Sequence, residues 1–279
     1  MMIQPLDYFA TLVSQDDAIP LFEAALAVAQ GIDARLDFGA TQAIVDNFAV
    51  TLQRRLAPDT TDIQKLRLLN QFFYRELGFG GNVNHFYDIG NSLLPQVIAT
   101  RRGIPISLAV LYMEMAQQIG LQVKGIAFPD HFLMRLSVPS GEIILDPLSG
   151  ISLTREALEE WLLPYIEPAE EPLKSALAHH LHAAHPREIL ARMLRNLKAI
   201  LIEDGNWEAF LAVQQRLVIL LPDDITERRD RGLAYANLLR PQPALQDLET
   251  YLAKRPYASD AAMLREKLPG LREARKRPG

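Results

Sequence analysis

The segment "PISLAVLYMEMAQQI", residues 105–119, constrains the fold of this chain more than any other part of the sequence. Pro105 stands where the first turn of a helix tolerates proline, and Gly120 follows the segment as a helix stop. Apolar side chains form one face and widen it on both sides: Ile106, Leu108, Val110, Leu111, Met113, Met115, Ala116 and Ile119. Such a helix has to be buried on most sides, so other elements must surround it.

Short runs rich in β-forming residues follow this helix. They are "LQVKGIAF", "FLMRLSV" and "EIILDP", and "PSG" is a turn signal between the last two. Strands joined this closely are antiparallel, so His131 near the start of one and Asp146 near the end of the other lie at the same end of the hairpin. We predict an antiparallel sheet over residues 121–147, packed on the helix of residues 105–119.

The first part of the chain is predicted to be helical. "IPLFEAALAVAQGID" and residues 41–56 precede a clearer helix in "PDTTDIQKLRLLNQFFYRELGFGG", for which Asp59 or Thr60 is the expected cap. The polar stretch "NVNHFYDIGN" then carries Asn84 and His85. Its composition fits a loop held by Asx turns and also fits a loop that lines a binding site.

The last third of the chain has a repeat period. Pro222 and Pro256 are 34 residues apart (256 − 222), which is the tetratricopeptide period. Gly232, Tyr235 and Ala244 fall between them at positions expected of such a repeat. Small residues there let two antiparallel helices approach closely, and the prolines end each pair so that the next can stack.

Residues 166–185 read as a linker, with two prolines, an acidic run and four histidines: His179, His180, His182 and His185. A histidine-rich tract can bind metal. No carboxylate or thiolate partner accompanies it, so we interpret it as a solvated segment and expect neither a metal nor a cofactor. The predicted division is a domain of residues 1–165, a linker of residues 166–185, and helical repeats over residues 186–279.

Composition excludes several classes of function. The net charge is −5 and the pI about 5.7, so neither nucleic acid nor an anionic membrane is favoured as a partner. The chain has no cysteine, which excludes disulfides, thiolate metal sites and a cysteine nucleophile, and fits a cytoplasmic location. We expect no signal peptide, because the N-terminus lacks a basic segment followed by an apolar one, and no membrane span, because no uncharged apolar run approaches about 18 residues.

Several motifs together resemble the SirB-type branch of transglutaminase-like proteins. They are "FYDIGNSLLPQVIATRRGIPISLAVLYMEMAQQIGL", "FPDHFLMRL", "ILDP" and, later, "PREILARMLRNLKAI" followed by tetratricopeptide-like helices. The resemblance covers most of the chain. It implies an α+β fold, in which a transglutaminase-like domain with a papain-type core is followed by an all-α tetratricopeptide-like helical hairpin module. It implies no settled reaction.

Catalytic members of the wider superfamily carry a cysteine at the head of a helix, followed along the chain by a His and an Asp. Laid on this chain without gaps, their pattern matches Gly103, Ala109 and Gly120. The resemblance then puts Pro105 at the position of the cysteine, and proline has no nucleophile.

The remaining triad candidates are Ser107, His131 and Asp146. Ser107 is the nearest hydroxyl, but it lies about 200° around the helix from residue 105. A serine nucleophile needs His131 as a general base and Asp146 to orient that base. The structural alternative is that His131 bonds to Asp146 to pin the hairpin, and that Ser107 satisfies a local backbone group. Arg101 and Arg102, which precede the helix, are either solvated or bind a carboxylate in the cleft.

Two hypotheses from different classes follow. The first is a non-catalytic or cryptically active transglutaminase-like protein that binds a protein or peptide partner through its cleft and helical repeats, with Arg101, Arg102, Asn84 and His85 as candidate binding residues. The second is a serine-type hydrolase or acyl transferase that uses Ser107, His131 and Asp146. The absent cysteine favours the first. A separation of about 3.2 Å or less between Ser107 Oγ and a His131 ring nitrogen distinguishes them, because it supports catalysis.

Overall fold

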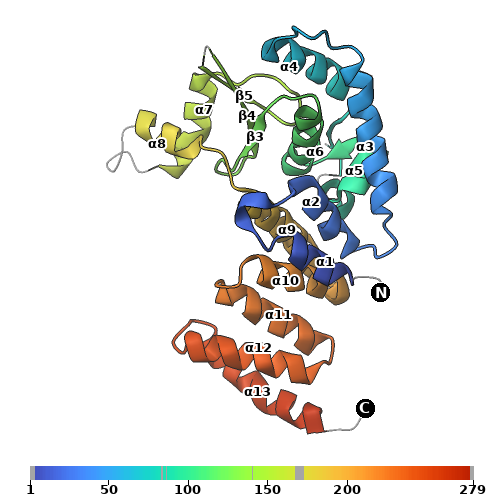
Figure 1. Cartoon of the computed structure of the whole chain (residues 1–279). Coiled ribbons are helices and arrows are strands. Elements are labelled where there is room, and N and C mark those ends of the chain that lie inside the picture. The colour runs from blue at the N-terminus through green and yellow to red at the C-terminus, as the bar shows by residue number, and fades with distance from the viewer. Residues whose placement is uncertain (1–3, 83, 86, 140, 167–172, 277–279) are drawn as a thin grey trace.

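A computed structural model describes residues 4–82, 84–85, 87–139, 141–166 and 173–276 (Figure 1). Its first part is a set of short helices around a central helix and a small sheet. In chain order the helices are α1 (Pro5–Leu12), α2 (Leu21–Gln30), α3 (Phe38–Gln53), α4 (Asp62–Asn70), α5 (Leu94–Thr100), α6 (Pro105–Gln118), α7 (Arg155–Leu162) and α8 (Leu173–His180). Short 3₁₀ turns lie at Asp16–Ala18, Ile89–Ser92 and Leu163–Tyr165, and a π-helical segment, Gln71–Glu76, continues α4.

The sheet has the predicted antiparallel form. Strands β3 (Val123–Ile126), β4 (Leu133–Val138) and β5 (Gly141–Leu145) are hydrogen-bonded in this order. Met134 lies opposite Leu145, so the loop before β4 and the residues after β5 meet at one end of the hairpin, as expected. A second, parallel pair joins β1 (Gly80–Gly81) to β2 (Arg102–Gly103), just before α6.

Helix α6 is buried on nearly every side, as its sequence requires. Ten of its 14 residues are buried. One face of the sheet packs against it through Met134, Leu136 and Leu145, while the other face is covered by α7 and α8 (Figure 1). The α+β class and the layered arrangement are therefore confirmed.

Helix ends follow local chemistry, with one difference from the prediction. The cap of α4 is Thr61 rather than Asp59 or Thr60, because Gln64 completes a capping box with Thr61: the Thr61 hydroxyl accepts from Gln64 N, and Gln64 Oε1 accepts from Thr61 N at 2.8 Å. The reciprocal bonds satisfy two free amides at once, which neither earlier residue can do.

The last third of the chain forms a stack of antiparallel helices that extends away from the sheet (Figure 1). A Cβ on Gly232 of α11 would lie 2.9 Å from Leu248 Cγ of α12, which shows how closely this pair approaches. The helices are α9 (Pro186–Glu203), α10 (Trp207–Leu220), α11 (Ile225–Asn237), α12 (Pro241–Lys254) and α13 (Ala261–Lys276).

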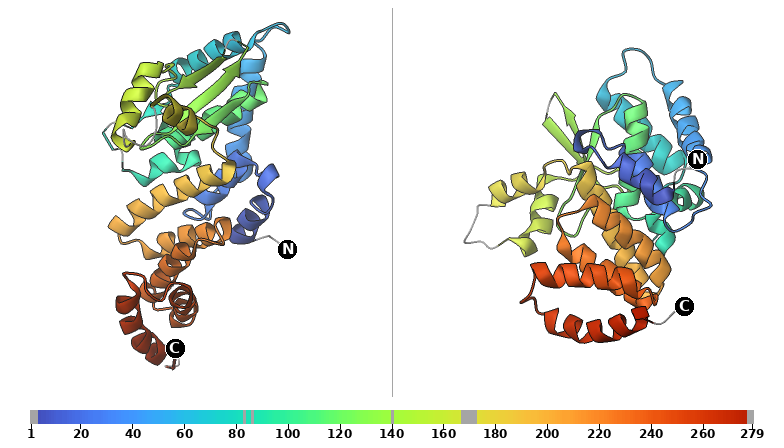
Figure 2. Two further views of the ribbon diagram at one scale, coloured as in Figure 1. Left: turned by 90° about the vertical axis from the view of Figure 1, so that its left-hand side faces the viewer. Right: turned by 60° about the horizontal axis from the view of Figure 1, so that its bottom comes forward.

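The first two helices of this stack are continuous with the core of the first part. One hydrophobic cluster runs from α1 and α6 into α9 and α10, and Figure 2 shows α9 directly beneath the sheet and its helices. Arg216 of α10 crosses to α2, where its Nε donates to Ala27 O at 3.0 Å. Burial lowers the pKa of Arg216 to about 10. The junction is thus a packed interface rather than a hinge.

Part of the segment expected to be a linker is ordered helix. Residues 167–172 lie outside the described residues, but residues 173–180 form α8, whose Ala176 and Leu177 are buried against α7 and the sheet. His185 has a structural role, since its Nδ1 accepts from Arg187 N at 3.2 Å and caps α9. Among the described residues, no group of three or more His, Asp or Glu side chains is placed to hold a metal ion.

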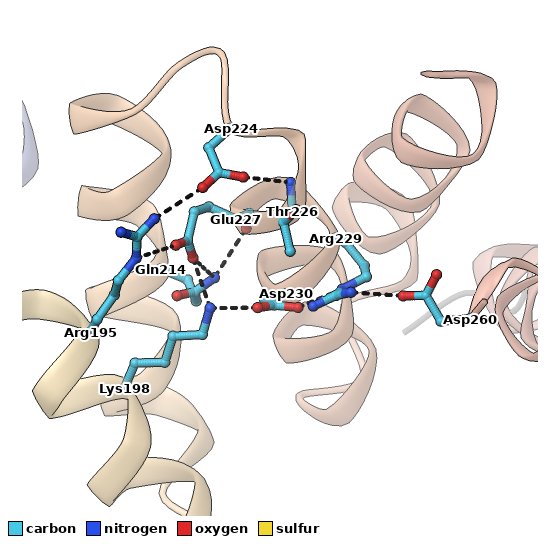
Figure 3. A network of polar contacts seen from close by, with 9 residues as sticks. All are labelled: Arg195, Lys198, Gln214, Asp224, Thr226, Glu227, Arg229, Asp230 and Asp260. Atoms are coloured by element: carbon cyan, nitrogen blue, oxygen red, sulfur yellow. Dashed lines mark hydrogen bonds and ion pairs between the residues drawn. The ribbon is translucent and has the colours of Figure 1, made fainter. Parts of the chain in front are cut away.

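A network of charges ties α9 to α11 (Figure 3). Glu227 of α11 is 3% exposed, and it accepts from Arg195 Nε at 3.0 Å and from Lys198 Nζ at 2.8 Å. Gln214 of α10 also donates to the Glu227 carbonyl at 3.0 Å. A buried carboxylate is tolerated only with such partners, so these contacts fix the register of the first repeat against α9.

We expect Glu227→Gln to lower the free energy of unfolding by about 1–3 kcal/mol, because Arg195 and Lys198 lose the charge of a buried partner. The measurement is chemical denaturation of the full chain. Glu273→Gln, at an exposed position on α13, is the matched control and should change stability by less than about 0.5 kcal/mol. Equal stabilities of the two variants would contradict a structural role for Glu227.

Candidate functional site

The head of α6 opens on a small cavity of about 280 Å³. Pro105 is the first helical residue, and the capping position is Ile104, whose side chain has no oxygen to offer the free amides of the first turn. Side chains from the β3–β4 loop, from α9 and from the segment before α5 complete the walls, among them Tyr87, Ser92, Asp130, Phe132, Arg192 and Asn196. Pro105, which the family resemblance places at the cysteine position, thus forms part of the cavity wall.

A larger cavity of about 700 Å³ lies at the other end of α6, with Met113, Gln117 and Lys124 in its walls. Its walls do not include Pro105, the residue that the family resemblance places at the cysteine position. The cavity at the head of α6 is therefore the better candidate, because it coincides with the helix end that the sequence singled out.

Ser107 does not face this cavity. It is fully buried, its Oγ lies 2.6 Å from Asn91 O, and the same oxygen accepts from Ile104 N at 3.1 Å. The hydroxyl therefore closes the turn between the loop after β1 and the start of α6. Ser107 thus satisfies local backbone groups, as in the structural alternative to a nucleophile.

His131 lies at the end of the β3–β4 loop, and its ring turns away from α6. The imidazole stacks on the indole of Trp161 in α7, with ring centres 4.2 Å apart and planes at 17°. Its backbone N–H donates to Phe128 O at 3.1 Å and tightens the loop. The side chain thereby fastens α7 to the sheet.

Asp146 forms a turn of its own after β5. One carboxylate oxygen accepts from Leu148 N at 3.0 Å and the other from Ser149 Oγ at 2.6 Å. Within the described residues, Asp146 has no hydrogen bond to His131, and His131 has none to Ser107. The predicted contact between His131 and Asp146 is therefore wrong. The hairpin brings the two residues to one end, but the imidazole stacks on Trp161 and the carboxylate binds groups of its own turn.

The four residues predicted to bind a ligand also lie outside the cavity walls. The Arg101 guanidinium sits over the rings of Phe48 and Phe79, at 5.0 and 4.8 Å from their centres. Arg102 Nη1 donates to Gly78 O at 2.7 Å. Both arginines therefore hold the β1–β2 region together, where burial lowers the pKa of Arg101.

Asn84 and His85 are exposed. The His85 carbonyl accepts from Asn91 Nδ2 at 2.6 Å, which fits the loop held by side-chain hydrogen bonds rather than a binding wall.

Arg192 and Asn196 of α9 are the cavity residues that the sequence did not reveal. They are four residues apart and so share one face of α9. The available signal was this pair of polar side chains within the apolar pattern of "PREILARMLRNLKAI". Nothing in the sequence indicates that this face meets the head of α6, more than 80 residues earlier.

The fold defines the class: an α+β domain built around a central helix whose head opens on the candidate cavity, followed by a repeat stack. A family model described as "Transglutaminase-like superfamily" matches residues 40–195, and a tetratricopeptide-repeat model matches residues 197–269. The chain belongs to the transglutaminase-like superfamily and carries C-terminal tetratricopeptide repeats.

Relatives extend over most of the chain. A UPF0162 protein of Xylella fastidiosa is 35% identical over 261 residues, which are 93% of this chain and 92% of the relative. Protein SirB1 of Salmonella typhimurium is 30% identical over 239 residues, 84% of this chain and 87% of the relative. The SirB-type resemblance is thus confirmed. No solved structure matches the chain.

We expect Ser107→Ala to lower the free energy of unfolding by about 1–3 kcal/mol, because it leaves a buried carbonyl and a buried amide with one partner fewer. Thermal and chemical denaturation measure the change. Ser137→Ala, at an exposed position on β4, is the control and should change stability by less than about 0.5 kcal/mol. Unchanged stability in Ser107→Ala would mean that the hydroxyl does not close this turn.

Proposed function

We propose that this protein binds a protein or peptide partner through the cleft at the head of α6 and through its helical repeats, and that it does so without acyl-transfer chemistry. Stacked helical repeats are an architecture that presents extended binding surfaces. The transglutaminase-like domain, residues 1–165, supplies most of the cleft, and α9 at the start of residues 186–279 closes it. The bacterial sources of the relatives and the absence of cysteine support a bacterial, cytoplasmic location.

One observation carries this proposal. Pro105 occupies the head of α6, while Ser107, the nearest hydroxyl along the chain, is buried and bonded to Asn91 O. A nucleophile must reach a substrate and a general base together. The contacts of Ser107 support binding over catalysis, because its hydroxyl has neither a route to the cavity nor a histidine partner among the described residues.

The alternative is a serine-type hydrolase or acyl transferase that uses Ser107, His131 and Asp146. It would require the start of α6 to unwind and the His131 ring to leave Trp161. Both changes give up contacts in the core of the domain, so we favour the binding role. No helix among the described residues combines the length and apolarity that a membrane span requires.

The chemical test is labelling with a serine-reactive fluorophosphonate probe. We expect the wild-type chain to remain unlabelled, because Ser107 Oγ has no general base beside it. The readout is intact-mass spectrometry of the folded protein. Stoichiometric labelling that is lost in both Ser107→Ala and His131→Ala, with stability retained, would overturn the binding role and establish a nucleophile.

The binding test is site-specific photo-cross-linking in a bacterial host. A photoreactive amino acid at Tyr87, on the rim of the cavity, and another at Met263, exposed on α13, are expected to cross-link the same partner. The control position is Ile63 of α4, exposed on the part of the domain farthest from the repeats (Figure 1). Equal cross-linking from all three positions, or none from Tyr87, would contradict a partner bound at the cleft.

A further inference from the structure

The cavity at the head of α6 contains a buried hydroxyl without a partner. Ser92 is 3% exposed and lines the cavity wall, yet its Oγ has no hydrogen bond within the part of the chain that the structure describes. Buried polar side chains in folded proteins are nearly always hydrogen-bonded. The Ser92 hydroxyl is therefore available to donate a hydrogen bond to a ligand atom in the cavity.

Arg192 brings a positive charge to the same wall. Its Nη1 donates to Phe128 O at 3.2 Å, and its guanidinium lies 5.9 Å from the centre of the Phe132 ring. Burial lowers the pKa of Arg192, with Asp130 opposing the shift, but no carboxylate of the described residues lies within 4.0 Å of it. A half-buried guanidinium without an ion pair favours an anionic ligand.

Two further hydrogen-bond donors at the cavity also favour a negatively charged ligand. Asn196 follows Arg192 by one turn of α9, and its side-chain amide has no hydrogen bond to any described residue. The first turn of α6 contributes the amide of Ile106, which no side chain caps. Free amides and the helix dipole make this end of a 14-residue helix favourable for a carboxylate.

Asp130 limits what kind of anion fits. Its carboxylate also lines the cavity, and the Tyr165 hydroxyl donates to one of its oxygens, which is the main reason that the pKa of Tyr165 is raised. A bare inorganic anion would be repelled by this carboxylate. A ligand with a carboxylate and an adjacent N–H complements both Asp130 and Arg192. The N–H donates a hydrogen bond to Asp130, and the carboxylate contacts Arg192.

The size and the remaining walls narrow the ligand further. About 280 Å³ is at the lower end of ligand cavities, so it suits one residue rather than an extended peptide. Phe132 and Ile200 give the cavity an apolar side. The last residue of a polypeptide combines all three features: an α-carboxylate, an amide N–H beside it, and an apolar side chain.

We propose that this cavity binds the C-terminal residue of a polypeptide partner that ends in an apolar side chain. The terminal carboxylate contacts Arg192, Asn196 and the head of α6. The Ser92 hydroxyl donates to the same carboxylate, and the last amide N–H of the ligand donates to Asp130. This assignment rests on the proposed function, since it specifies what part of a partner enters the cleft.

The test compares three probes by two-dimensional ¹H–¹⁵N NMR of the full chain. They are N-acetyl-glycyl-leucine with a free carboxylate, the same peptide with a C-terminal amide, and free leucine. We expect the free-carboxylate peptide to shift the amide signal of Ile106 and the side-chain signal of Arg192 saturably, with an affinity at least about tenfold above that of the amidated peptide, because only it forms charge-assisted bonds. Free leucine should bind more weakly, since its ammonium is more costly to desolvate than an amide.

Variants link any binding to the cavity. Arg192→Gln keeps a donor for Phe128 O but loses the charge, and Asn196→Ala removes an amide that has no described partner, so the second variant remains informative if the first is unstable. Both should weaken the free-carboxylate peptide by at least about fivefold. Arg54→Gln, at an exposed arginine just after α3, should leave its affinity unchanged.

Each other outcome overturns the assignment. Equal affinity for the acid and the amide excludes recognition of the carboxylate, and equal or tighter binding of free leucine makes the ligand an amino acid rather than a polypeptide end. Absence of shifts with all three probes, or binding unaffected by Arg192→Gln and Asn196→Ala, excludes this cavity. Cross-linking at Tyr87 combined with no preference for the acid would leave the proposed function standing while this inference fails. Binding of the free-carboxylate peptide without any cross-linked partner would support this inference and contradict the proposed function.

Discussion

The packing of α9 against two different surfaces at once is the interaction on which the rest of the structure depends. One side of α9 is buried in the cluster that also contains α2 and α6, and the other side forms the first helical pair of the repeats with α10. Arg216 and the Glu227 network fix its neighbours in place, because buried charges accept only a narrow range of geometries. The position of the repeat stack relative to the cleft is therefore set by the same apolar and ionic contacts that stabilise both parts.

This arrangement also determines which side chains line the cavity at the head of α6. Pro105 begins α6 without an amide of its own, and Ser107 uses its hydroxyl to close the preceding turn, so both positions serve the helix start. The cavity polarity comes instead from α9, through Arg192, and from the β3–β4 loop, through Asp130. A cavity lined in this way offers charge and hydrogen-bonding groups to a ligand, which is consistent with the binding role proposed above.

His131 and Asp146 illustrate how a shared chain order differs from a shared function. The antiparallel hairpin brings both residues to one end, as the order of motifs indicates, yet Trp161 stacks on the imidazole and the Leu148–Ser149 turn occupies the carboxylate. Aromatic stacking buries the imidazole, and an Asx turn gives the carboxylate hydrogen-bond donors from neighbouring residues. The contacts of His131 stabilise the loop before β4, and those of Asp146 stabilise the turn after β5.

The sequence by itself determined the elements that depend on short-range patterns. The all-round apolar character of residues 105–119 required a buried helix, the change of period after Gly120 predicted the antiparallel sheet, and the 34-residue spacing of Pro222 and Pro256 predicted the repeats. Only the tertiary structure decided which side chains face the cavity, because Arg192 reaches the head of α6 through a packing contact that no periodicity encodes. It also decided the rotation of His131, since the ring could pair with Asp146 or stack on Trp161, and that choice depends on where α7 docks on the sheet.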